Sequence, residues 1–166
     1  NPLAGERIAG TVGFALPGQQ VRVADEDGKA VPAGEVGMIE VSGPNVFQGY
    51  WRMPEKTAEE VRPDGFFITG DLGTQDAQGR LSIVGRSKDL VISGGYNVYP
   101  KEVEVARDGL PQISESAVIG LPHRDFGEAV VAVVVPSAGQ VTLAEVDQAL
   151  TDKLARFKQP KQVLNV

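Results

Sequence analysis

Short alternations of apolar and polar residues run through residues 1–42 and predict β-strands joined by turns. Residues 21–23 alternate before a turn at Asp27–Gly28, and residues 38–41 supply a second short apolar strand. Because side chains alternate between the two faces of a strand, this pattern is typical of strands buried on one face. The first part of the chain is therefore expected to be rich in β structure.

A helix and a hairpin are predicted next. Pro54 has the fixed backbone angle that suits the first turn of a helix, and Glu55 and Glu59 favour its amino-terminal end. Residues 66–69 and 81–84 are then expected to form two strands around a turn at residues 76–79. In this arrangement the TGDLG motif of residues 69–73 lies at a strand end, with an exposed carboxylate.

The pattern changes after Lys88 and predicts the order strand, helix, strand, strand, helix, strand. The first helix begins at Pro100 and reaches about Arg107, with apolar positions spaced by three and four. The run EAVVAVVVP at residues 128–136 is continuously apolar, as expected of a strand buried on both faces. The remaining elements are strands at residues 89–92, 116–121 and 162–166 and a helix at residues 142–157.

The second helix has the clearest signals. Thr142 and Glu145 have capping-box spacing, and apolar residues that include Leu150 and Leu154 follow one face. Lys153, Arg156 and Lys158 are expected to complement its negative carboxy-terminal end.

The change of pattern near residues 85–88 predicts two domains and an α+β fold class. Residues 1–85 form a β-rich piece, expected to be an incomplete barrel at the end of a larger domain. Residues 86–166 form a small mobile α+β domain with a short sheet and two to three helices, truncated at its end.

Composition narrows the possible functions. The net charge of −6 argues against a broad nucleic-acid surface, which needs a positive field, but permits a small basic pocket. The absence of cysteine excludes disulfides, thiolate metal sites and cysteine nucleophiles. A single histidine, His123, excludes a multi-histidine zinc site and is interpreted as a loop residue rather than a base. No apolar run approaches the roughly 20 residues of a membrane span, and the start lacks a signal-peptide layout, so a cytoplasmic protein is expected.

Asp71 and Arg86 are the first candidates for chemistry. Asp71 could accept two hydrogen bonds from a sugar diol, or it could simply bond its own turn. The hairpin should return Arg86 toward Asp71, where it could hold a phosphate or a ribose oxygen, or form a surface ion pair worth well under ~1 kcal/mol. Lys88, where the chain passes between domains, is either a hinge or a solvated charge.

Two later segments offer further candidates. Gly94 and Gly95 would allow a close approach of the backbone to another surface, or satisfy a loop that needs positive φ. Phe157, Lys158 and Lys161 could stack a nucleobase and hold phosphates, or merely end a helix with positive charge. The chain has no phosphate-binding loop of the GxxxxGK[ST] type and no GxGxxG motif.

Together these motifs resemble one family. The ordered run from GYW through TGDLG to GRSKDLVISGGYNVYPKEVE, residues 49–104, is similar to the adenylate-forming acyl-CoA synthetases. Within that family, residues 43–57 are most similar to the malonyl-CoA synthetase branch. The resemblance covers essentially the whole chain and implies the carboxy-terminal portion of such an enzyme.

The resemblance implies two half-reactions with ATP, Mg²⁺ and coenzyme A. A carboxylate and ATP give an acyl-adenylate and diphosphate; the small domain then rotates, and coenzyme A forms the thioester. By resemblance, adenylate binding falls to Asp71 and Arg86 and the hinge to Lys88. The coenzyme A tunnel is assigned to Gly94 and Gly95, and the coenzyme A nucleotide to Phe157, Lys158 and Lys161.

Other parts of the family pattern are absent from this sequence. The phosphate loop and the acyl pocket would precede Asn1, and the lysine that drives adenylation would follow Val166. No catalytic residue and no metal ligand is therefore expected in this chain, and the chain alone is predicted to be inactive. The competing hypothesis is a non-catalytic nucleotide- or coenzyme A-binding module, or a regulatory module, of the same fold. Partners are expected to be small molecules, without nucleic acid and without a membrane span.

Overall fold

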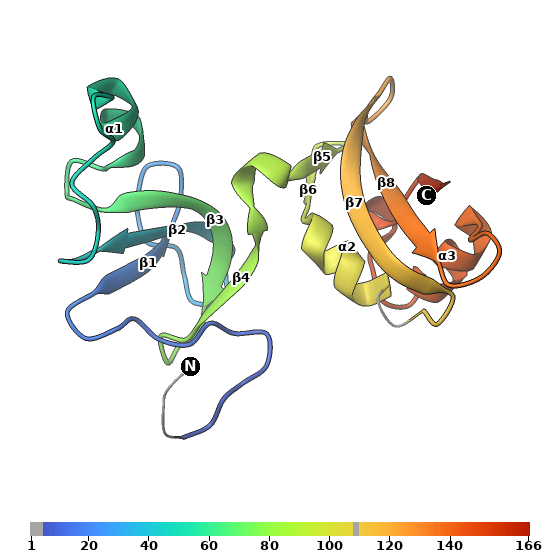
Figure 1. The fold of residues 1–166 in the computed structure, drawn as a ribbon, viewed down its shortest axis with the longest axis horizontal. Coiled ribbons are helices and arrows are strands. Elements are labelled where there is room, and N and C mark those ends of the chain that lie inside the picture. Colours follow the sequence, from blue (N-terminus) through green and yellow to red (C-terminus); the bar gives the residue numbers. More distant parts are fainter. Residues whose placement is uncertain (1–4, 108–109) are drawn as a thin grey trace. The chain divides into compact units, whose positions relative to one another are not determined.

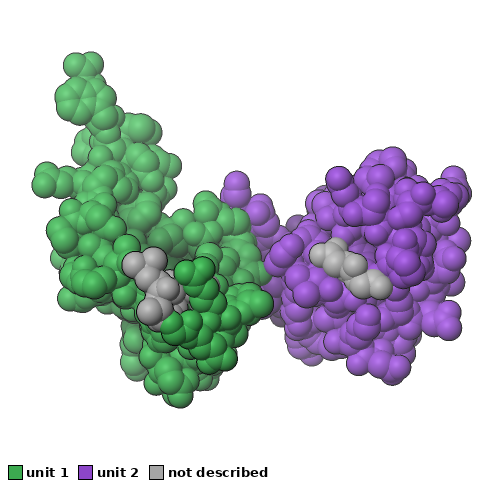
Figure 2. Space-filling view, turned by 60° about the horizontal axis from the view of Figure 1, so that its bottom comes forward, with its two compact units in different colours: residues 1–87 green, residues 88–166 purple. Residues whose placement is uncertain are grey.

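The computed structural model describes residues 5–107 and 110–166, which divide into two compact units (Figures 1 and 2). The first unit runs to Ser87 and the second extends from Lys88 to Val166. Each unit has its own sheet, so the fold is α+β and rich in β structure, as predicted. Every helix in the described ranges is too short or too polar to cross a membrane.

The first unit is built on an open sheet of four antiparallel strands in the order β1-β2-β3-β4 (Figure 1). Its elements are β1 (Gln20–Ala24), β2 (Gly37–Ser42), α1 (Pro54–Glu60), β3 (Phe67–Gln75) and β4 (Leu81–Arg86). Pro54 opens α1, as expected from its backbone angle. The strand predicted for residues 66–69 was expected to end near Thr69. This end is wrong, because Thr74 and Gln75 of β3 still pair with β4.

The second unit folds around a sheet in the order β6-β5-β8-β7, and β9 pairs with residues 131–134 of β8. Pairing is antiparallel except between β8 and β9, which run parallel. Its elements are the 3₁₀ turn η1 (Ser87–Asp89), β5 (Val91–Ser93), β6 (Tyr96–Val98), α2 (Pro100–Arg107), β7 (Ile113–His123), β8 (Gly127–Pro136), α3 (Leu143–Leu150), the 3₁₀ turn η2 (Arg156–Lys158) and β9 (Gln162–Asn165).

The core of the second unit lies between its sheet and its two helices. Residues 129–132 of β8 are buried in succession, which confirms the prediction from the continuous apolar run. The core consists of Val91, Val98, Val103, Ile113, Val118, Val130, Ala132, Val134, Val141, Val146, Leu150 and Leu154. These apolar side chains provide the main driving force for folding this unit.

Several predictions in this unit need correction. Strand β6 was missed, because three residues with two exposed side chains leave almost no periodic signal. His123 is the last residue of β7 rather than a loop residue, since it pairs with Gly127 across the β7–β8 hairpin.

The helix predicted for residues 142–157 ends at Leu150. Ala155 has an extended backbone, with φ −56° and ψ 144°, so a separate turn places Phe157 against the core. Lys153 and Lys158 consequently do not cap this helix; their ammonium groups contact the Ala106 carbonyl and the Glu102 carboxylate.

Replacing Thr142 by alanine is expected to destabilise the second unit by about 1 kcal/mol. The capping box is formed as predicted: the Thr142 hydroxyl accepts the Glu145 N–H, and the Glu145 carboxylate accepts the Thr142 N–H at 2.8 Å. Hydrogen bonds from the Thr142 side chain and backbone lower the pKa of Glu145 below its ordinary 4.5.

The stabilisation linked to Glu145 is therefore present above pH 4.5 and is lost as the pH falls through the lowered pKa. The measurement is urea unfolding of wild type and Thr142→Ala at several pH values in the acid range. The difference between their free energies of unfolding should narrow below pH 4.5, and a difference that widens there would contradict the assignment.

Candidate functional site

Asp71 lies within strand β3, in a bulge that sets the direction of its side chain. Met38 and Glu40 of β2 pair with Leu72 and Ile68 of β3, so the segment between Ile68 and Leu72 contains two extra residues. Gly70 has φ +75°, a conformation that favours glycine. Asp71 is thus half-buried in mid-strand, not exposed at a strand end as expected.

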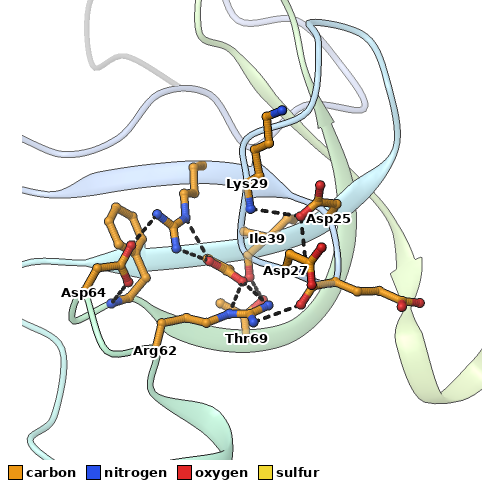
Figure 3. Close-up of polar contacts among 11 residues, drawn as sticks. Asp25, Asp27, Lys29, Ile39, Arg62, Asp64 and Thr69 are labelled. Carbon is orange, nitrogen blue, oxygen red and sulfur yellow. Dashed lines mark hydrogen bonds and ion pairs between the residues drawn. The ribbon is translucent and has the colours of Figure 1, made fainter.

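The Thr69 hydroxyl ties this bulge to the neighbouring strand. It donates to the Ile39 carbonyl at 2.8 Å (Figure 3) and accepts the Asp71 N–H at 3.1 Å. A β-branched side chain with a stiff χ1 angle is well suited to hold such a bridge. The TGD sequence therefore has a local structural explanation, independent of any ligand.

Arg86 lies directly across the hairpin from Asp71, as the hairpin length predicts. Arg86 Nη1 is 2.7 Å from Asp71 Oδ1, and the two side chains are 49% and 26% exposed. An ion pair this accessible contributes little to stability, about 0–1 kcal/mol. The second carboxylate oxygen and the remaining guanidinium donors are suited to neighbouring hydroxyl and phosphate groups.

A buried ion network supports β2 beside this bulge. The Glu40 carboxylate is fully buried, and its two oxygens lie 2.7 and 2.9 Å from the guanidinium groups of Arg22 and Arg62. Arg22 also bonds Asp64, and Arg62 donates to the Glu26 carbonyl; Figure 3 shows these contacts converging. The hydrogen bond from Arg22 lowers the pKa of Asp64. Only Val23, Ala24 and Ile39 are buried apolar residues among those described in this unit, so the network forms much of its interior.

Gly94 and Gly95 form the two-residue turn between β5 and β6. Their φ angles are +60° and +82°, as in a type I′ turn, and this alone accounts for glycine at both positions. A Cβ atom on Gly94 would lie 3.8 Å from the Phe126 ring, and one on Gly95 would meet nothing within 4 Å. Within this unit, the positive φ angles require glycine at both positions, whereas there is room for a Cβ atom at each.

Gly94, Phe157 and Lys161 line one pocket of about 710 Å³ in the second unit. Tyr96 stacks on Phe157, with ring centroids 4.7 Å apart and planes inclined by 29°. The other lining residues are Ser93, Phe126 and Arg156. Aromatic faces beside an arginine and a lysine are suited to an aromatic base that carries phosphates.

Lys158 and Lys88 lie elsewhere in this unit. Lys158 Nζ is 2.7 Å from Glu102 and its side chain is 21% exposed, so its ammonium is already paired. Lys88 lies in the single turn η1, at the first position of the second unit. Sequence reasoning missed Tyr96 and Arg156 as lining residues. The aromatic residue directly after the glycine pair was the available signal for Tyr96.

A second hollow, of about 590 Å³, lies beside α1 in the first unit and includes the exposed Trp51. Its lining residues are Gln48, Gly49, Tyr50, Trp51, Arg52, Pro54, Thr57, Ala58 and Val61. It contains none of the predicted site residues. Within residues 5–107 and 110–166, no group of three His, Asp or Glu side chains could hold a metal ion.

Comparisons with known proteins match both units. Residues 2–51 match the AMP-binding enzyme family, and residues 102–166 match the AMP-binding enzyme C-terminal domain. The chain is 43% identical to an indoleacetate–CoA ligase of Aromatoleum aromaticum, over 98% of this chain and 32% of the relative. It is 38% identical to a malonate–CoA ligase of Arabidopsis thaliana, over 99% of this chain and 28% of the relative.

The fold matches solved structures as well. The crystal structure of ATP-bound MatB from Rhodopseudomonas palustris superposes with a TM-score of 0.95 at 59% identity, over the whole of this chain and 33% of that chain. The chain thus spans about a third of the length of these relatives.

Proposed function

The chain belongs to the AMP-binding enzymes, and from this premise we propose that it is the carboxy-terminal part of an ATP-dependent acyl-CoA synthetase. The proposed reaction has two half-reactions. A carboxylate attacks the α-phosphate of ATP to give an acyl-adenylate and diphosphate. The thiol of coenzyme A then attacks the acyl carbon, and AMP leaves. The relatives are named as ligases that join acids to coenzyme A, which supports this proposal.

The observation that carries the adenylate half of the proposal is the Asp71–Arg86 pair on its bulged strand. In the proposed complex, Asp71 accepts hydrogen bonds from the two ribose hydroxyls and Arg86 contacts the adenylate. The Thr69 bridge holds the backbone of Asp71 and Arg86 holds its carboxylate, so the residue loses little entropy when such a ligand binds. We assign none of the described residues to the Mg²⁺ that accompanies ATP.

The pocket of the second unit supports the coenzyme A half of the proposal. The turn at Gly94–Gly95, of which Gly94 lines the pocket, is assigned to the passage for the thiol arm, and Phe157 and Lys161 to the nucleotide end. Arg156 adds a second cation beside Phe157, which suits several phosphates better than one lysine does. Lys158 is proposed to act indirectly, by holding Glu102 against η2, and Lys88 is proposed as the hinge at the junction of the units.

The acid is proposed to be malonate or a related short acid. This finer proposal rests on the resemblance of residues 43–57 to the malonyl-CoA synthetase branch. The malonate–CoA ligase among the relatives supports it.

The full-length protein that contains this chain is expected to release AMP only when ATP, coenzyme A and a suitable carboxylate are all present. The measurement is AMP formation with a panel of carboxylates that includes malonate, methylmalonate, acetate and an aryl acid. Malonate should give the highest kcat/KM. Failure of every carboxylate to release AMP would favour the non-catalytic module instead, and a preference for the aryl acid would refute only the choice of malonate.

A further inference from the structure

We infer that Glu128 is a positioning residue for the thioester-forming half-reaction, because its carboxylate fixes the Gly94–Gly95 turn through the Ile92 N–H. This inference rests on the proposed function and adds a residue to it. Three observations lead to it: the geometry of the turn, the contacts on its far side, and the space made for the carboxylate.

The Ile92 N–H points away from β6. In a two-residue hairpin, the residues that flank the turn exchange hydrogen bonds, and here these are Ser93 and Tyr96. The next pair, Ile92 and Asn97, is therefore a non-hydrogen-bonded pair, whose N–H groups face outward. The Ile92 N–H needs an acceptor on the side of β5 opposite β6.

Strand β8 offers β5 only one paired position, between Ser93 and Gly127. Glu128 Oε2 takes the place of a strand carbonyl and accepts the Ile92 N–H at 2.7 Å. The Gly94 N–H donates to the Phe126 carbonyl at 2.9 Å. The β7–β8 hairpin thus holds the glycine turn at two points, one of which is a charge-assisted hydrogen bond.

The opposite strand leaves room for this carboxylate. A Cβ atom on Gly120 of β7 would lie 2.8 Å from Glu128 Oε1 and 3.1 Å from its Cδ, so any larger residue at Gly120 would displace the side chain. Gly120 has no positive φ that would otherwise require glycine. The same Cβ atom would lie 3.2 Å from Val91 Cγ1, so space for Glu128 and Val91 together is the reason that the structure gives for glycine at this position.

Fixing the turn matters because it carries part of the pocket. Ser93, Gly94 and Tyr96 line the pocket, and all lie within four residues of Ile92. Val91 and Ser93 of β5 are buried, but Ile92 between them is 52% exposed, so its side chain does little to hold the backbone at this position. Loss of the carboxylate should let the turn move relative to Phe157 and the bound thiol arm.

The experiment measures the two half-reactions separately in the full-length protein. Adenylate formation is followed by diphosphate release without coenzyme A, and thioester formation by mixing preformed enzyme-bound adenylate with coenzyme A. Glu128→Ala is expected to slow thioester formation about tenfold, as the loss of one charge-assisted hydrogen bond implies. Adenylate formation should stay within about twofold, because the adenylate contacts assigned within this chain, Asp71 and Arg86, lie in the other unit.

Two further variants separate positioning from folding. Glu128→Gln keeps an acceptor oxygen and should restore thioester formation to within about threefold of wild type. Glu115→Ala removes an exposed carboxylate from the same sheet and should change neither half-reaction. In Glu128→Ala, amide hydrogen exchange at Ile92 and Gly94 should be about tenfold faster.

The outcomes distinguish this inference from the proposed function. If wild type forms no adenylate or no thioester, the proposed function fails and the role of Glu128 fails with it. If wild type is active, the inference alone is overturned when Glu128→Ala slows both half-reactions equally or slows neither. A Glu128→Gln variant that performs no better than Glu128→Ala would overturn it too. If Glu128→Ala does not fold, the comparison of Glu128→Gln with wild type decides, and a loss in thioester formation well beyond threefold overturns the inference.

Discussion

Replacement of Asp71 by alanine in the full-length protein is expected to lower kcat/KM for ATP in adenylate formation roughly a hundredfold. The proposed ribose contacts are two charge-assisted hydrogen bonds, each worth about 1.5 kcal/mol, and about 1.4 kcal/mol corresponds to a factor of ten. The Asp71–Arg86 pair is exposed enough that its loss should destabilise the fold by less than about 1 kcal/mol. A large kinetic effect with a small stability effect is therefore the expected signature.

The measurement is diphosphate release at varied ATP, with urea unfolding of the same proteins. Asp27→Ala, in the exposed turn after β1, is the matched control and should behave as wild type. Asp71→Asn keeps one acceptor oxygen and should lose less activity than alanine. If Asp71→Ala forms adenylate at the wild-type rate, the Asp71–Arg86 pair is only a surface ion pair, which is the alternative interpretation of the sequence.

Replacement of Glu40 by alanine is expected to destabilise the first unit by about 3 kcal/mol, the largest stability effect predicted for this chain. The substitution leaves the guanidinium groups of Arg22 and Arg62 facing each other without the buried carboxylate that neutralises them. Removing one partner of a buried ion pair is costly, because the remaining charge has already been taken out of bulk water. The effect is set near the lower end of the usual range because both arginines are about one-fifth exposed.

Amide hydrogen exchange along β2 and β3 is the suitable measurement, because Trp51 is 84% exposed and is a poor fluorescent probe of folding. Glu35→Ala removes an exposed carboxylate just before β2 and should stay within about 0.5 kcal/mol of wild type. A triple replacement of Arg22, Glu40 and Arg62 by apolar residues should be far less harmful than Glu40→Ala alone. Equal exchange rates in wild type and Glu40→Ala would contradict the role assigned to the network.

Local signals in the sequence predicted the elements that depend on neighbours in the chain. The capping box at Thr142, the proline that opens each of the first two helices, and the buried run of β8 all formed as expected. The hairpin length was also enough to place Arg86 beside Asp71. These features depend on residues close in sequence or on a simple alternation, so no knowledge of the tertiary fold was needed.

Features set by distant contacts were not predictable in the same way. The bulge at Gly70 depends on the hydrogen bond to the Ile39 carbonyl. Helix α3 ends early because the segment after it must change direction before residue 162 can pair with Val131. Tyr96 and Arg156 line the same pocket although they are 60 positions apart in the sequence. The roles of Asp71, Lys88 and the glycine pair stay predictions.

The position of β8 between an antiparallel and a parallel neighbour has a consequence for biosynthesis. Residues 131–134 acquire their antiparallel partner from the preceding strand, but their parallel partner, Gln162–Asn165, is synthesised about thirty residues later. Until then an apolar strand presents one row of unpaired backbone groups, which is the arrangement that invites pairing with other chains. During translation, the ribosome or a chaperone that shields this stretch until residue 165 emerges would thus protect the nascent chain from aggregation.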